Sequence, residues 1–183
     1  MYWITFFIAG YTALALQTAL GGYIHIAGAA PDLLLPLAVF VCINARRPQA
    51  LLGAVILGLF QDMFSSRPLG LHAFAYGLAG LLVVGARPVV HRDHPLTCFA
   101  MTLAAAGMVA AVVLVNQWAY PRIHRLADWP AASVAAEAYR AAYTAFVAPA
   151  VMAALNRVRR LFGFRPDHVF APRAGDAWRE RRT

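Results

Sequence analysis

The chain has 183 residues, of which 61% are hydrophobic and only 13% are charged, and its formal net charge is +8. This composition excludes an ordinary soluble domain, in which about a quarter of the residues are charged, and indicates a membrane protein. A positive charge of this size can indicate nucleic-acid binding, but all the basic residues are arginines that flank apolar segments, about half of them after Val151, and this distribution favours anionic lipid headgroups over nucleic acid.

Six apolar segments of helical length follow one another along the chain. A bilayer core about 30 Å thick requires about 20 helical residues at about 1.5 Å per residue. The segments bounded by Arg, Pro or Gly clusters cover residues 2–20, 32–44, 49–64, 69–86, 95–118 and 131–155. The second segment is short and contains Pro36, so it is either a half-span or an extension of residues 23–30. We therefore predict an all-α integral membrane protein with about six transmembrane helices.

The arginines favour one side of the membrane. With the N-terminus inside, the cytoplasmic side receives more of them: Arg46, Arg47, Arg87, Arg92 and the run that begins at Arg157, against Arg67, Arg122 and Arg125 outside. Because positive residues accumulate in cytoplasmic loops, this bias places both termini in the cytoplasm. The aromatic residues Trp118, Tyr120 and Trp129 fit the interfacial belt at the opposite boundary.

The chain divides into two parts at this level. Residues 1–156 form the transmembrane helical domain, and residues 157–183 form an Arg-rich cytoplasmic tail with prolines, glycine and alternating charge. Such a composition buries little apolar surface, so we expect the tail to be flexible and to lie along anionic lipid.

Asp62 is the most informative polar residue, because a carboxylate inside a span is costly unless it is paired, protonated or hydrated. It lies about 13 residues after Gln49, roughly 20 Å along a helix and therefore in the outer half of the membrane. A turn follows, and a helical hairpin would bring Arg67 and His72 back to Asp62. We predict a structural polar hub formed by Gln61, Asp62, Arg67 and His72; a proton or ion site is the alternative interpretation.

Other polar residues in the spans are expected to be structural. Asp32 follows Pro31 at the start of the second segment, where a short acid can cap the exposed amides of a helix. Glu137 and Arg140 have the spacing of a pair on one helical face, which we expect to be solvated at the interface. The amides of Gln17, Asn44, Asn116 and Gln117 are expected to bond between helices.

Small residues in the fourth segment predict close helix packing. Helices in lipid gain little from hiding apolar surface, so close approach of small side chains has to hold them together. The candidates are Gly70, Ala73, Gly77 and Gly80, with Ala138, Ala141, Ala142 and Ala145 in the sixth segment. They serve packing within this chain or docking of another protein, and both interpretations stay open.

No motif for catalysis, metal or cofactor binding stands out. The chain has no G-x-S-x-G, no H-E-x-x-H and no P-loop, and Cys42 and Cys98 have no spacing typical of a metal or disulfide site. The run His91-Arg92-Asp93-His94 is interpreted as a polar turn beside Pro95. We therefore predict no enzyme, no cofactor and no metal site.

Three motifs in the second to fourth segments resemble a known family. The runs Pro31-Asp32-Leu33-Leu34-Leu35, Gly58-Leu59-Phe60-Gln61-Asp62 and Pro68-Leu69-Gly70-Leu71-His72-Ala73 are similar to the core signature of the bacterial rod shape-determining protein MreD. The fifth and sixth segments agree with that family only in length and hydropathy. The positions that match the motifs are Asp32, Gln61, Asp62, Gly70 and His72, and the resemblance implies no chemistry for them.

The resemblance implies a non-enzymatic scaffold in the bacterial cytoplasmic membrane that regulates cell shape. Its implied fold is a helical bundle similar to the substrate-binding S-components of energy-coupling vitamin transporters. Its implied partner is MreC, with RodA, a penicillin-binding transpeptidase and cytoskeletal MreB as further members of the peptidoglycan elongation complex. The long Arg-rich tail departs from many relatives, and a contact with MreB or with lipid alone are both open. The rival function is a substrate-binding component of a small-molecule transporter, in which Asp62 or His72 touches the ligand.

Overall fold

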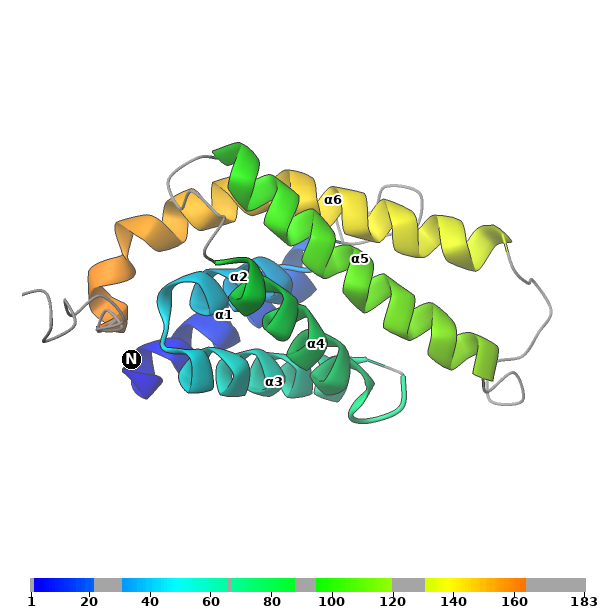
Figure 1. Ribbon diagram of the computed structural model, residues 1–183, viewed down its shortest axis with the longest axis horizontal. Coiled ribbons are helices and arrows are strands. Elements are labelled where there is room, and N and C mark those ends of the chain that lie inside the picture. Colours follow the sequence, from blue (N-terminus) through cyan, green and yellow to red (C-terminus); the bar gives the residue numbers. More distant parts are fainter. Residues whose placement is uncertain (1, 22–30, 66, 88–94, 120–130, 164–183) are drawn as a thin grey trace, which may run out of the picture.

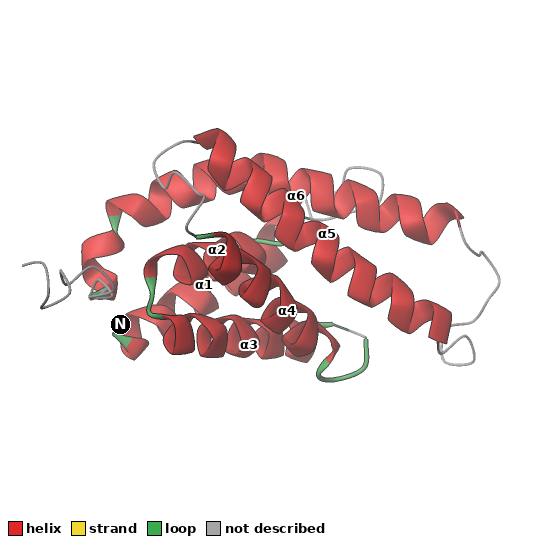
Figure 2. Cartoon of the chain, viewed as in Figure 1, coloured by secondary structure: helices red, strands yellow, loops and turns green. Residues whose placement is uncertain are grey.

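All regular secondary structure in the described part of the chain is helical (Figure 2). The computed structural model describes residues 2–21, 31–65, 67–87, 95–119 and 131–163. Its elements are α1 (Trp3–Gly21), α2 (Leu34–Asn44), α3 (Arg47–Phe64), α4 (Leu71–Ala86), α5 (Pro95–Ala119), α6 (Ala131–Arg157) and the short 3₁₀ helix η2 (Arg159–Phe162). The all-α prediction is confirmed, and each predicted segment contains one helix whose ends differ by no more than two residues.

Two of these helices are long and apolar enough to cross a bilayer on their own. They are the 24-residue stretches Leu96–Ala119 of α5 and Val134–Arg157 of α6. Shorter apolar stretches occupy α1, α2 and α4. The number of spans therefore stays a prediction, although large apolar side chains on the outside of the bundle fit a lipid environment. Ile4 is 77% exposed and Phe146 is 78% exposed, and water would make such a surface unfavourable.

The short helix α2 lies at the centre of the bundle. Every residue from Leu34 to Ile43 is buried, and α2 contacts α1, α3, α4, α5 and α6. A helix that is apolar on all sides is typical of such a core position. Its 11 residues extend about 16 Å, half of a bilayer core. This favours the half-span interpretation, and the alternative extension through residues 23–30 lies outside the described residues.

The helices form two layers (Figure 1). The long antiparallel pair α5 and α6 packs across the group formed by α1 to α4 and extends beyond it on the right of the view. Within the lower layer, α3 and α4 form a tight hairpin. A Cβ atom on Gly58 of α3 would lie 2.5 Å from the carbonyl oxygen of His72 and 2.6 Å from Cα of Ala73. Only glycine at position 58 allows the two helices to approach this closely.

The local sequence explains how the two ends of this hairpin form. Pro48 lies in the first turn of α3, where the missing N–H would have no helical partner in any case. At the other end, Gly70 precedes α4 with φ +94°, a left-handed conformation that glycine adopts without strain. The chain thus turns from α3 into α4 within the six residues from 65 to 70.

Both ends of the described chain meet at one end of the bundle, on the left of Figure 1. The amide of Tyr2 donates to the carbonyl oxygen of Phe162 at 2.8 Å, and the Phe162 ring packs edge-on against Phe40 of α2 with centroids 5.6 Å apart. Phe162 is 1% exposed. The first part of the segment assigned to the flexible tail, residues 157–163, is therefore folded against the bundle, and residues 164–183 lie outside the described residues.

Candidate functional site

Asp62 organises the turn between α3 and α4. Its Oδ1 accepts hydrogen bonds from the backbone amide of His72 and from His72 Nδ1, both at 2.9 Å. Its Oδ2 accepts from the amides of Gly70 at 2.9 Å and Ala73 at 3.0 Å. The first amides of any helix lack intrahelical partners, so a carboxylate at the end of α3 caps the start of α4. Asp62 is 1% exposed, and four donors surround its charge.

The predicted hub is only partly assembled around Asp62. His72 joins it directly, whereas Arg67 turns away and forms an ion pair with Glu137 of α6. Gln61 accepts a hydrogen bond from Gln17 of α1 at 3.3 Å. Asp62 and His72 contact each other, whereas Gln61 contacts Gln17 and Arg67 contacts Glu137. The four hub candidates therefore lie in one region but do not form a single cluster.

A second buried carboxylate, Asp32, joins three helices. Its Oδ1 accepts from the amides of Leu34 at 3.1 Å and Leu35 at 3.3 Å, at the start of α2. Its Oδ2 accepts from the Tyr76 hydroxyl of α4 at 2.6 Å and lies 3.5 Å from Arg140 Nη2 of α6. Asp32 thus contacts the helix end at which the capping role was expected, and it also binds α4 and α6.

Two further contacts complete these links. The amide of Asp32 donates to Thr144 Oγ1 at 3.0 Å, and the amide of Leu33 donates to Gln17 Oε1 at 2.9 Å. Thr144 lies 13 residues from each end of α6, about 20 Å from either end. Asp32 is therefore held at mid-length of the longest helix.

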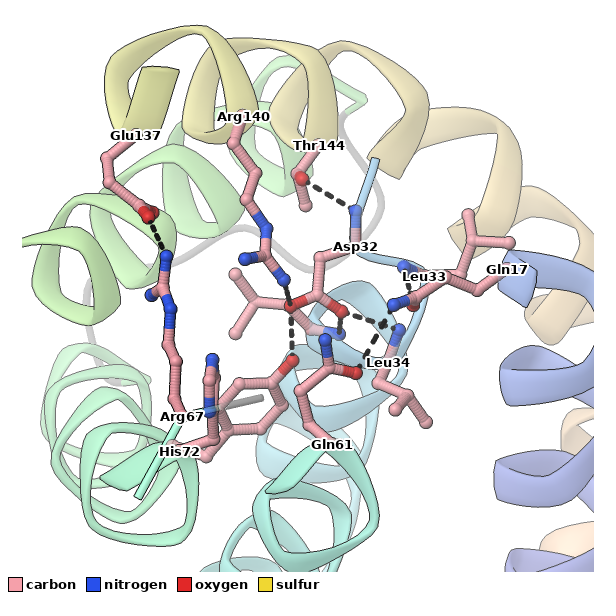
Figure 3. Close-up of polar contacts among 12 residues, drawn as sticks. Gln17, Asp32, Leu33, Leu34, Gln61, Arg67, His72, Glu137, Arg140 and Thr144 are labelled. Atoms are coloured by element: carbon pink, nitrogen blue, oxygen red, sulfur yellow. Dashed lines mark hydrogen bonds and ion pairs between the residues drawn. The ribbon is translucent and has the colours of Figure 1, made fainter. Parts of the chain in front are cut away.

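We call this set of side chains the polar network: Gln17, Asp32, Gln61, Asp62, Arg67, His72, Tyr76, Glu137, Arg140 and Thr144. Figure 3 shows Glu137, Arg140 and Thr144 pointing from α6 toward Arg67 and Asp32. It links α1, α2, α3, α4 and α6. The prediction that Glu137 and Arg140 pair with each other at a solvated interface is wrong. Glu137 is 7% exposed, and both residues have ion-pair partners on other segments.

Several members of the network were absent from the predicted hub, although the sequence holds a signal for them. Glu137, Arg140 and Thr144 stand at positions i, i+3 and i+7 of an Ala-rich helix, and His72 and Tyr76 stand at i and i+4. These spacings place each set on a single helical face. Polar residues that share one face of an apolar helix indicate a buried contact rather than a lipid-facing one.

The network carries three carboxylates, two guanidinium groups and one histidine, and almost every polar atom in it is used. Of its buried side-chain nitrogens and oxygens, only His72 Nε2 and Arg67 Nη1 have no hydrogen-bond partner. A cavity of about 20 Å³ borders Asp32, Glu137, Arg140 and Thr144, which is room for about one water molecule. Within the described ranges, no group of three or more His, Cys, Asp or Glu residues could hold a metal ion. The arrangement is suited to fixing helices in place.

The small residues of the fourth segment have different surroundings. A Cβ atom on Gly77 would lie 3.2 Å from Val55, and one on Gly80 would lie 3.0 Å from Ala54, so both glycines face α3. Ala73 lies against Gly58, as described above. Gly70 is not a helix-packing residue, because it precedes α4 and a Cβ atom there would meet nothing within 4 Å.

The other predicted packing and interface residues differ in their exposure. In α6, Ala145 is fully buried, whereas Ala138 and Ala142 are exposed. Trp118, at the end of α5, is 72% exposed, as an interfacial residue would be. The loop that holds His91 to His94, and the aromatic residues Tyr120 and Trp129, lie outside the described residues.

Comparisons with known proteins give one match. The family model of the rod shape-determining protein MreD matches residues 1–126. This range includes α1 to α5 and therefore every member of the polar network except the three from α6. No curated protein and no solved structure matches the chain.

Proposed function

The chain belongs to the rod shape-determining protein MreD family, whose members are structural membrane proteins, and we propose that it is a non-enzymatic scaffold of the rod-shape complex. In this role it binds MreC in the bacterial cytoplasmic membrane and helps to position the peptidoglycan elongation enzymes. The family belongs to the rod-shape complex with MreC in general. RodA, a penicillin-binding transpeptidase and MreB are the further partners that we propose.

The observation that supports a scaffold is the inward direction of the polar network. Asp62 and Asp32 together accept seven hydrogen bonds, all from this chain. A buried charge that is fully hydrogen-bonded fixes one arrangement of its neighbours, because every alternative would leave that charge unpaired. A scaffold needs such a fixed shape so that partners meet a constant surface.

The cavity beside the polar network is too small to support a transporter role. Pockets for small organic molecules usually enclose about 300–1,000 Å³ and present a few polar groups. The cavity that borders Asp32 and Arg140 encloses only about 20 Å³. Native mass spectrometry of the purified protein tests this role, and a reproducible stoichiometric polar ligand would favour it.

We propose that six helices enter the bilayer and that both termini are cytoplasmic. The helices alternate in direction, so the α2–α3 corner, the end of α4 and the end of α6 all lie at the end of the bundle that holds η2 (Figure 1). That end carries Arg46, Arg47, Arg87 and Arg157. At the other end, the described arginines Arg67 and Arg140 are paired with acids. A cysteine-accessibility assay on Arg47→Cys and Leu69→Cys tests the orientation, since only the second position should react from outside.

Co-purification tests the scaffold proposal. We expect tagged chain, co-expressed with MreC from the same bacterium, to retain MreC in mild detergent well above the level held by an unrelated polytopic membrane protein with the same tag. Asp62→Asn, which can still donate and accept hydrogen bonds, should retain MreC as well. Loss of MreC from the wild-type chain in several mild detergents would count decisively against this function.

A further inference from the structure

An apolar groove runs between α1 and α6, away from the polar network. It encloses about 460 Å³ over α2 and ends at η2. Its lining is almost wholly aliphatic, with Ile8, Leu16, Leu37, Val151, Leu155 and Leu161 among its walls. The polar exceptions are Thr5 and Thr12, whose hydroxyls donate to the carbonyl oxygens of Leu161 and Ala9, each at 3.0 Å. The groove thus offers no spare donor to a polar ligand.

Small side chains explain why this space exists. Ala9 and Ala13 of α1 and Ala154 of α6 face the groove, and none of them reaches across it. Both helices pack against α2, and both contact η2 at one end. The 3₁₀ helix η2 therefore borders one end of the groove, where Thr5 and Tyr2 bond to it, and the groove extends along α1 from there.

The length of the groove corresponds to one leaflet. Along α1 it reaches from Thr5 to Leu16, which is 11 residues and about 17 Å of helix. Half of a bilayer core is about 15 Å. A single acyl chain that enters at the η2 end would therefore be covered along its whole extent.

The charge at the η2 end indicates which headgroup the ligand carries. Arg157 is the last residue of α6 and directly precedes the lining residue Val158. Arg157 is exposed. An aliphatic slot with an exposed cation at its end is complementary to a lipid with an anionic headgroup.

We propose that this groove binds one acyl chain of an anionic phospholipid, with the phosphate held at Arg157. The lipid then fills the space between α1 and α6 and holds α1 against the bundle. The assignment of this site to the cytoplasmic leaflet rests on the proposed orientation.

Lipid retention by the full-length protein tests the site. We expect native mass spectrometry in mild detergent to show one added phosphatidylglycerol per chain and to show less retention of phosphatidylcholine. Arg157→Gln should weaken phosphatidylglycerol binding about fivefold. Arg47→Gln removes one exposed arginine from the same end of the bundle and should leave binding unchanged.

A second pair of variants tests the groove itself. Ala154→Trp places a large ring in the groove and should abolish retention, whereas Ala142→Trp, on an exposed position of the same helix, should not. Equal retention of both lipids by wild type and all variants would show adventitious binding only and would overturn the proposal. Photo-crosslinking from Ala13 to another protein, with no retained lipid, would also overturn it, because the occupant would then be a partner helix. MreC co-purification should be unaffected by Arg157→Gln, so the two proposals fail separately.

Discussion

Replacement of Asp62 by leucine should destabilise the bundle strongly, because the carboxylate accepts hydrogen bonds from the backbone amides at the start of α4. Three of its four donors are fully buried: the amides of His72 and Ala73, and His72 Nδ1. A buried donor without an acceptor costs about 1–3 kcal/mol. The simple sum for Asp62→Leu is then about 3–9 kcal/mol, with the upper part reduced because such costs are not additive. The fourth donor, the amide of Gly70, is only partly buried and can turn toward water.

Asparagine at the same position should cost less. Its carbonyl oxygen can take the place of Oδ2 and accept from Gly70 and Ala73, while its amide donates to His72 Nδ1 if the ring proton moves to Nε2. Two buried donors then lack an acceptor, the His72 amide and the proton on Nε2, so the simple sum is about 2–6 kcal/mol, again reduced by non-additivity. The order wild type, Asn, Leu follows from the hydrogen-bond geometry alone.

The measurement is the free energy of unfolding from an SDS titration in mixed micelles, followed by helicity. Met63→Leu is the matched control, because Met63 is adjacent in the chain and 73% exposed, and it should unfold like wild type. An Asp62→Leu midpoint equal to that of wild type would refute the capping role. Equal losses for Asn and Leu would instead show that the charge of Asp62, and not its hydrogen bonds, holds the hairpin.

Three further predictions use the same titration. Gly58→Ala should destabilise the protein by about 1–3 kcal/mol because its Cβ atom would overlap the backbone of α4. The control Gly85→Ala has open space around it and should be neutral or slightly stabilising. Equal effects of the two variants would refute the close approach of α3 and α4. Arg67→Gln and Glu137→Gln should show a coupling energy of about 1 kcal/mol or more in a double-mutant cycle, since the pair is largely buried, and additive losses would argue against the ion pair. Tyr76→Phe should cost about 1–2 kcal/mol of unfolding free energy, because the hydrogen bond to Asp32 is lost. A neutral result would show that this hydrogen bond is absent from the protein folded in the membrane.

The helices follow from the sequence because each depends on a local pattern. Runs of apolar residues bounded by Gly, Pro or Arg predicted all six within two residues of their ends. The contact of Asp62 with His72 was also accessible, since only ten positions separate them and a tight turn lies between. Local patterns of this kind need no knowledge of how distant segments pack.

The rest of the network could not be derived in this way. Asp32 bonds to Tyr76, 44 positions away, and its amide bonds to Thr144, 112 positions away. Arg67 was placed with Asp62 on the basis of proximity in the chain, but Glu137 on α6 is its partner. These pairings depend on how α6 lies across α2 and α4, which no spacing within one helix specifies.

The two acids explain how helices can begin inside this bundle. Lipid offers no acceptors or donors, so a helix that starts below the membrane surface leaves its first amides unsatisfied unless protein supplies the partners. Asp32 does so for α2 and Asp62 does so for α4. Asp32 also contacts Tyr76 of α4 and Arg140 of α6, and Asp62 accepts from the His72 ring of α4. Hydrogen bonds therefore fix the half of the bundle near the α3–α4 turn.

The opposite half is held differently. The Phe162 ring packs against Phe40, one backbone hydrogen bond joins Tyr2 to Phe162, and Arg157 is exposed. Removal of a charge should therefore have opposite consequences at the two ends: loss of folding at Asp32 or Asp62, and altered lipid binding with an intact fold at Arg157. If Arg157→Gln unfolded the protein as Asp62→Leu should, this division of roles between the two halves would be wrong.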